Sequence, residues 1–157
     1  MLESFSEAEK ITTRIQKLII FSLSAALLAC LVSVASAQSV YEPARGSAER
    51  KAILDTIRPL VEVRVGPPVE FVVGWMRSGN GWAFARVDPQ RPGGGAIDLR
   101  FTSYANQAEF MDDLTTYALL VYRYNRWNLV DFVVGPTDVF WVGDPLYAQL
   151  PPGLTPY

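Results

Sequence analysis

The chain contains no histidine among its 157 residues, and its single cysteine, Cys30, lies in an apolar run near the N-terminus. The absence of histidine excludes Ser-His-Asp and Cys-His catalysis, histidine general bases and the usual zinc sites. A single cysteine has no partner for an internal disulfide bond. The sequence also has no Walker-type phosphate loop and no dinucleotide-binding glycine fingerprint, the signatures of the common nucleotide-dependent enzymes.

The chain also has no excess of basic residues over acidic ones. The chain has 14 lysine and arginine residues against 16 aspartate and glutamate residues, which gives a net charge of −2 at pH 7. The two signs are spread along the chain, so no basic block follows a phosphate backbone and we expect no nucleic-acid partner. Asp112 and Asp113 lack the spacing of a calcium loop and are typical of turn and cap residues, so we expect no metal or other cofactor.

The first forty residues carry the pattern of a secretory signal peptide. An uncharged, largely apolar segment starts at Leu18 and ends in small residues, and three basic residues precede it, namely Lys10, Arg14 and Lys17. The small residues precede Gln38 in the sequence Ala-Ser-Ala-Gln, which is typical of a cleavage site. We therefore predict a signal peptide over residues 1–37, cleavage between Ala37 and Gln38, and a single exported α+β domain over residues 38–157.

Two alternatives to cleavage remain open. An uncleaved leader would anchor the chain in the inner membrane through Leu18 to Ala37, because this segment approaches the ~20 residues that span a bilayer. The stretch before Cys30 resembles a lipobox, in which the cysteine becomes the lipidated first residue, but the residues after it stay apolar. We expect a periplasmic or secreted protein, with membrane contact only if the leader is retained or Cys30 is lipidated.

The domain begins with a predicted helix. Ser47 is a suitable N-cap, and apolar residues recur on one stripe at Ile53, Ile57 and Leu60. Pro59 is expected to end or kink this helix near residue 58. The stretch from Leu60 to Val65 alternates like a strand, but a proline at its start and a glycine after it favour a short second helix.

Antiparallel strands are predicted after this helix. The turn sequence 78–81 joins strands 69–77 and 82–88, with Trp75 opposite Phe84 and Val73 opposite Arg86. The stretch from Ile97 to Phe101 alternates cleanly and reads as a third strand. Strands 115–124 and 127–134 follow, joined by residues 125 and 126, and the proline-rich end from residue 151 is expected to trail over the surface. The fold class is therefore α+β, an N-terminal helix packed on a curved antiparallel sheet of about five strands.

Several short segments together resemble a family of small secreted proteins of Gram-negative bacteria whose activity is uncharacterised. These segments are residues 50–58, 69–73, 82–84, 118–122 with Trp127, and 135–139 with Trp141. The resemblance implies an exported, periplasmic single domain and supplies no catalytic residues. The order of elements is also similar to the cystatin-like and nuclear-transport-factor-like superfamilies, in which a curved sheet wraps a helix.

Asp131 is the candidate acid of greatest interest. The predicted pairing places it diagonal to Tyr122 on an apolar face, where a carboxylate has a raised pKa and can act as an acid or base. The competing interpretation is that this face is solvent-exposed and that Tyr122 simply covers it. Trp75 and Trp127 are expected in the core, and the arginines around the triple glycine, Arg86, Arg91 and Arg100, are weak candidates for anion binding.

The sequence favours an exported domain that binds a protein or a cell-envelope component and catalyses no reaction. This expectation depends on the absence of an assembled catalytic set. The alternative is small-molecule binding or catalysis in the concave face of the sheet through Asp131 and Tyr122.

Overall fold

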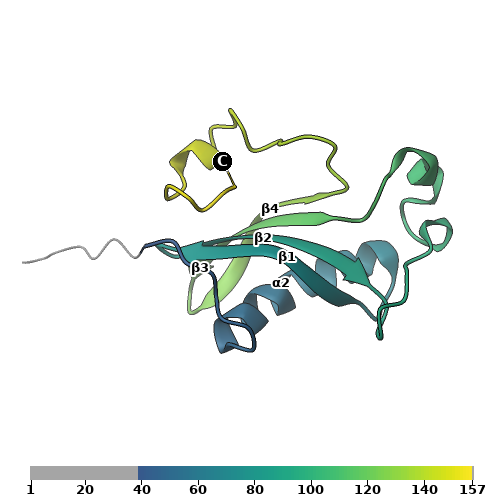
Figure 1. Ribbon diagram of the computed structural model, residues 1–157, viewed down its shortest axis with the longest axis horizontal. Coiled ribbons are helices and arrows are strands. Elements are labelled where there is room, and N and C mark those ends of the chain that lie inside the picture. Colours follow the sequence, from purple (N-terminus) through teal and green to yellow (C-terminus); the bar gives the residue numbers. More distant parts are fainter. Residues whose placement is uncertain (1–38, 157) are drawn as a thin grey trace, which may run out of the picture. The chain divides into compact units, whose positions relative to one another are not determined.

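The computed structural model describes residues 39–156 of the chain. The signal peptide, the cleavage site between Ala37 and Gln38, the alternative anchor from Leu18 and the lipidation of Cys30 lie outside these residues and stay predictions. No helix in residues 39–156 combines the length and the hydrophobicity that a membrane span requires. The described chain forms one α-helix and a four-stranded antiparallel sheet, which confirms the α+β class (Figure 1).

The helix α2 (Ala48–Val65) begins and ends where the capping residues indicate. The side chain of Ser47 accepts a hydrogen bond from the backbone N–H of Arg50, which satisfies one free donor of the first turn. At the other end Gly66 adopts a φ of 77°, and its N–H donates to the carbonyl of Glu62.

Pro59 does not end the helix, so the predicted end near residue 58 and the predicted second helix are both wrong. The residues from Leu60 to Val65 are helical, as the flanking proline and glycine favoured, but they continue the same helix. The buried stripe is Ile53, Ile57, Val61 and Val65, at intervals of four residues. Because this stripe packs on the sheet, tertiary burial outweighs the hydrogen bond that proline removes from the helix interior.

The sheet is a simple meander whose strands lie in chain order. These strands are β1 (Glu70–Gly79), β2 (Trp82–Gln90), β3 (Thr116–Arg123) and β4 (Arg126–Val134). The predicted strand from Ile97 to Phe101 is wrong, because residues 99–101 form a 3₁₀ turn, η1 (Leu99–Phe101), that Asp98 caps. A second 3₁₀ turn, η2 (Ala105–Phe110), follows in the same connection. Alternation alone does not make a strand where no partner strand pairs with it.

The first hairpin turns more tightly than predicted. Only Asn80 and Gly81 form the loop, both with positive φ (51° and 75°), which is the geometry of a type I′ turn. The register therefore places Trp75 opposite Arg86 rather than opposite Phe84. The rings of Trp75 and Phe84 still meet edge to face on the diagonal, with centroids 5.7 Å apart.

The second hairpin also uses a two-residue turn, but not at the predicted position. Tyr124 and Asn125 form it, with φ values of 56° and 59°, so Tyr122 lies opposite Trp127. Further along β4 a bulge at Val130 shifts the register, and Asp131 lies opposite Leu119. A shift of one residue moves every later side chain of the strand to the other face.

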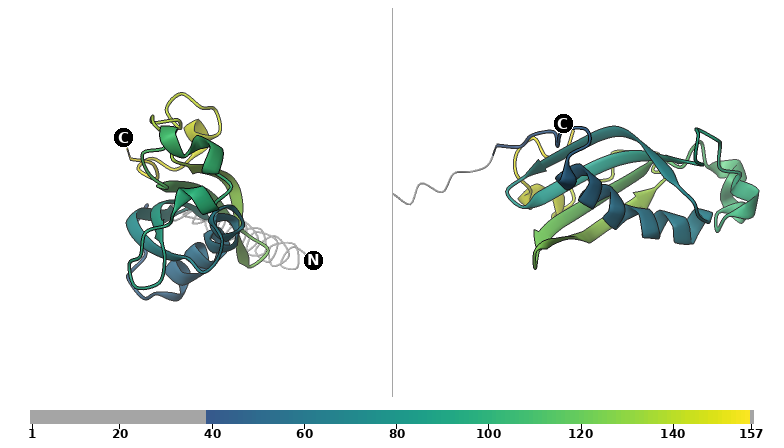
Figure 2. Two further views of the ribbon diagram at one scale, coloured as in Figure 1. Left: turned by 90° about the vertical axis from the view of Figure 1, so that its right-hand side faces the viewer. Right: turned by 90° about the horizontal axis from the view of Figure 1, so that it is seen from below.

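Each face of the sheet is covered by a different part of the chain. On one face, α2 packs on a buried layer that includes Met76, Ala85, Leu120 and Trp127. On the other face, the segment 140–154 (yellow in Figure 1) packs on Phe84. Figure 2 shows the same arrangement from two further directions.

The C-terminal end does not trail over the surface, which corrects the prediction. Leu154 is fully buried, and the indole N–H of Trp141 donates to the carbonyl of Pro156. Aromatic rings hold the segment 140–154 in place, since Trp141 and Tyr147 both meet Phe84 edge to face. This segment is therefore a second covering layer of the domain.

We expect Leu154→Ala to lower the free energy of unfolding by about 2–4 kcal/mol, because it removes a fully buried side chain and leaves a cavity. Urea denaturation followed by tryptophan fluorescence measures the change. The control is Val142→Ala in the same segment, where the side chain is 65% exposed, and its effect should stay within about 0.5 kcal/mol. Equal effects of the two substitutions would contradict a packed C-terminal layer.

Candidate functional site

The predicted pair of Asp131 and Tyr122 does not form a site. Tyr122 pairs with Trp127, whose side chain packs on the α2 side of the sheet. The bulge at Val130 turns Asp131 to the other side, where it lies opposite Leu119 and contacts the segment 140–154. The sheet itself therefore separates the two side chains. The Tyr122 hydroxyl donates instead to the side-chain oxygen of Asn125 at 2.9 Å.

Asp131 has a partner that the sequence did not indicate. The hydroxyl of Tyr147, a buried residue of the C-terminal segment, donates to its Oδ2 at 2.8 Å, and the backbone N–H of Phe132 donates to its Oδ1. Burial and the adjacent Asp131 carboxylate raise the pKa of the Tyr147 hydroxyl above its ordinary range. This contact ties the C-terminal segment to β4, which is a structural role.

Two of the three arginines around the triple glycine have hydrogen-bond partners within the domain. Arg91 donates to the carbonyls of Val65 at 2.7 Å and Gly66 at 2.6 Å, so it caps the C-terminal end of α2. Arg100 pairs with Asp98, whereas Arg86 lies 3.9 Å from Asp88 and its buried Nε has no hydrogen-bond partner in the described part of the chain. The contacts of Arg91 and Arg100 therefore argue against the anion-binding hypothesis for this loop.

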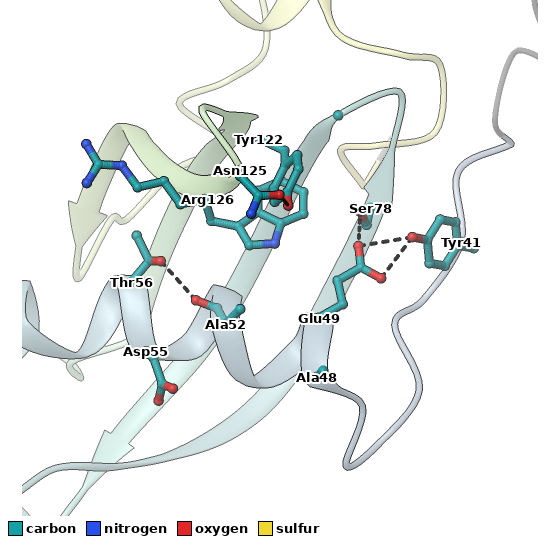
Figure 3. Close-up of a pocket in the computed structure, with 12 residues that line it drawn as sticks. Tyr41, Ala48, Glu49, Ala52, Asp55, Thr56, Ser78, Tyr122, Asn125 and Arg126 are labelled. Atoms are coloured by element: carbon teal, nitrogen blue, oxygen red, sulfur yellow. Dashed lines mark hydrogen bonds between the residues drawn. The ribbon is translucent and has the colours of Figure 1, made fainter.

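A hollow lies where α2 begins and the two hairpins end. Its cavity volume is about 710 Å³. Three residues of its wall have no side chain larger than a methyl group, which leaves the space open. They are Ala48 and Ala52 of the helix and Gly81 of the first hairpin turn. Figure 3 shows this end-of-sheet pocket, whose other walls are Tyr41, Glu49, Asp55, Thr56, Ser78, Tyr122, Asn125, Arg126 and Trp127.

Glu49 is held in the end-of-sheet pocket by the side chains of two neighbouring residues. Its carboxylate accepts hydrogen bonds from the Tyr41 hydroxyl at 2.9 Å and 3.0 Å and from the Ser78 hydroxyl at 2.7 Å (Figure 3). Burial and the bond to Glu49 raise the pKa of Tyr41, so its hydroxyl keeps the proton that it donates. Tyr41 and Ser78 also exchange backbone hydrogen bonds, which joins residue 41 to the edge of β1.

The other charged groups at the pocket differ from Glu49 in their surroundings. Asp55 pairs with Lys51 at 2.5 Å and lies 4.0 Å from the guanidinium of Arg58. In Figure 3, Asp55 and Arg126 both extend away from Glu49. In the described part of the chain, no ion pair involves Glu49, whereas Asp55 has two basic neighbours.

Aromatic rings form the wall opposite α2. Trp127 is 8% exposed, and its ring meets that of Tyr122 edge to face at 5.3 Å. Tyr122 and Tyr41 are each nearly half exposed and therefore accessible to a ligand. The core prediction for Trp127 is confirmed, but the ring also borders the pocket.

A second hollow lies on the opposite flank of α2, against β1. It has a volume of about 500 Å³, and Arg45, Arg50, Lys51 and Arg58 border it. Most of these cations already have partners: Arg50 donates to the carbonyl of Pro43, Lys51 pairs with Asp55, and Arg58 donates to the carbonyl of Val69. The end-of-sheet pocket is therefore the stronger candidate for a binding site.

Catalytic and metal-binding arrangements have little support in the described residues. From residue 39 to 156, no group of three or more His, Cys, Asp or Glu side chains is placed to hold a metal ion. Asp113 accepts a hydrogen bond from the backbone N–H of Thr115, which is the turn role expected for the adjacent aspartates. Comparison with protein-family models, with curated proteins and with solved structures found no match to this chain.

Sequence reasoning did not identify the end-of-sheet pocket. Its residues come from the N-terminal lead, the first turns of α2 and both hairpin ends, so no short motif contains them. The one available signal is the pair Ala48 and Ala52, four residues apart, which puts two small side chains on one face of the helix.

The raised pKa of Tyr147 predicts a loss of stability at alkaline pH. The folded state holds this proton more tightly than the unfolded chain, in which the tyrosine titrates near pH 10.0. The contribution of the Tyr147 hydroxyl to the free energy of unfolding is therefore complete below pH 10 and is lost as the pH rises above 10. We expect the free energy of unfolding to fall more steeply between pH 10 and 12 in the native protein than in Tyr147→Phe. At pH 7 the same substitution should cost about 1–2 kcal/mol, because Asp131 loses its donor.

Denaturation of both proteins across this pH range provides the measurement. The titration of the other six tyrosines affects both proteins equally, so it cancels in the difference between their free energies of unfolding. Parallel pH profiles would contradict the assigned role of the bond between Tyr147 and Asp131.

Proposed function

We propose that this chain is exported and that its domain binds a partner protein of the cell envelope without catalysing a reaction. The observation that carries this proposal is the end-of-sheet pocket, an accessible hollow with aromatic and charged walls. The partition of Asp131 and Tyr122 onto opposite faces argues against the catalytic alternative. The periplasmic location rests on the leader pattern of residues 1–37 and on the resemblance to secreted proteins.

Small-molecule binding is the second candidate. A cavity of about 710 Å³ falls in the range of about 300–1,000 Å³ that ligand pockets occupy. In this alternative Tyr122 contacts the ligand from the end-of-sheet pocket, and Asp131 takes no part. The helix followed by an antiparallel meander is compatible with a cystatin-like or nuclear-transport-factor-like relationship, which we keep as a proposal.

A photo-reactive amino acid at position 52 tests partner binding in cells that naturally produce the chain. Ala52 lines the pocket on an exposed helix position, so the substitution should leave the fold intact. We expect one discrete cross-linked protein from position 52. The matched control is position 63 of the same helix, where Val63 is 85% exposed and borders neither hollow.

Two results would contradict partner binding at this pocket. One is the absence of any cross-linked species from position 52, and the other is an equal yield of the same species from position 63. Competition by excess unlabelled protein should abolish the product, whereas the variant Ala52→Trp, which fills the pocket, should not compete.

Export makes a separate prediction about the chain end. N-terminal sequencing of the protein recovered from the periplasmic fraction should begin at Gln38, because cleavage follows Ala37. A start at Met1 in a membrane fraction would indicate the anchored alternative, and a lipidated Cys30 would indicate the lipoprotein. The intact chain in the cytosol would contradict export.

A further inference from the structure

We propose that the end-of-sheet pocket receives the cationic side chain of a lysine or arginine from the partner protein. This inference rests on the proposed function and names the chemistry of the group that the site recognises. Three features of the pocket support it: the charge at Glu49, the aromatic rings in its walls and the open space between α2 and the hairpin ends.

The charge of Glu49 is the first feature. Its carboxylate is partly buried and, among the residues that the structure describes, accepts hydrogen bonds only from the neutral hydroxyls of Tyr41 and Ser78. Within residues 39–156, no lysine or arginine forms an ion pair with it. A partly desolvated carboxylate without a counter-ion attracts a cation more strongly than an exposed one, because less water screens the charge.

Other charges near the pocket do not cancel this attraction. Asp55 already has Lys51 and Arg58 as partners, so it neither competes for the incoming cation nor adds a free charge. Arg126 borders the pocket, but its side chain is directed away from Glu49 (Figure 3). The negative potential of the pocket is therefore concentrated at Glu49.

Aromatic rings are the second feature. Tyr41 and Tyr122 are 43% and 45% exposed, and Trp127 also lines the pocket. A cation within about 6 Å of such a ring is attracted by its quadrupole, and the effect grows as water is removed. A carboxylate beside aromatic rings suits an ammonium or guanidinium group better than a neutral or anionic one.

The shape of the pocket is the third feature. Because Ala48, Ala52 and Gly81 leave the space open, a long unbranched side chain can reach past the helix towards Glu49. The methylene groups of lysine or arginine can then lie on the tyrosine rings while the charged end meets the carboxylate. The cavity volume of about 710 Å³ also leaves space for the adjoining backbone of the partner.

Nuclear magnetic resonance titration of the domain tests this inference with two small probes. The probes are N-acetyl-arginine amide and N-acetyl-citrulline amide, which have nearly the same shape but differ in charge. We expect the arginine probe to shift the amide signals of Ala52 and Asn125 and to bind about tenfold more tightly than the citrulline probe. Raising the ionic strength should reduce this preference.

Variants then locate the charge that matters. Glu49→Gln should abolish the preference for the arginine probe, whereas Glu49→Asp should retain most of it because the negative charge remains. The matched control is Glu109→Gln, which removes one exposed negative charge that borders neither hollow. Circular dichroism melts of each variant establish that it is folded before the comparison is made.

The inference is overturned if both probes bind equally, if neither binds, or if Glu49→Gln and Glu109→Gln have the same effect. The comparison of the two probes on the native protein does not depend on any variant folding. If position 52 still cross-links to a partner while the two probes bind equally, partner binding stands and only the cationic recognition fails. If position 52 yields no cross-linked partner, the proposed function fails, and the recognition of a partner's side chain fails with it.

Discussion

The bulge at Val130 controls which side chains of β4 reach each layer of the domain. Leu129 and Phe132 both pack on the α2 side because one extra residue lies between the two paired segments of the strand. The same insertion turns Asp131 to the opposite face, where its carboxylate accepts a hydrogen bond from the Tyr147 hydroxyl. Without the bulge, the polar residue would enter the helix-side core, and the C-terminal segment would lose its hydrogen-bonded contact with the sheet.

The covering of both faces determines where a ligand can bind. With α2 on one side and the segment 140–154 on the other, the broad surfaces of the sheet are filled by the chain's own side chains. Space remains at the end of the sheet, where small helix residues meet the two hairpin ends. Glu49 connects three parts of the chain there, since Tyr41 and Ser78 both donate to its carboxylate, and this shared contact keeps the pocket walls together.

Interactions between neighbouring residues explain the helix limits that the sequence predicts. They also explain the first hairpin turn, for which the sequence-based register was wrong. The caps at Ser47 and Gly66 depend on neighbouring residues only, so the helix limits could be read from the sequence. Asn80 and Gly81 are also a strong local signal for a two-residue turn, and applying that rule would have corrected the first register. Tyr124 is different, because a bulky residue with a positive φ is uncommon and only the pairing of the flanking strands imposes it.

The sequence was sufficient for the leader pattern, the α+β class, the helix caps and the exclusion of histidine chemistry and of an internal disulfide bond, because each depends on composition or on residues close together in the chain. The bulge at Val130, the burial of Leu154 and the end-of-sheet pocket could not be read in this way. These features arise from contacts between segments that are distant in the sequence. Which of those contacts form depends on the packing of the whole domain. The separation of Asp131 from Tyr122 is the functional consequence, since one inserted residue in a strand places them on opposite sides of the sheet.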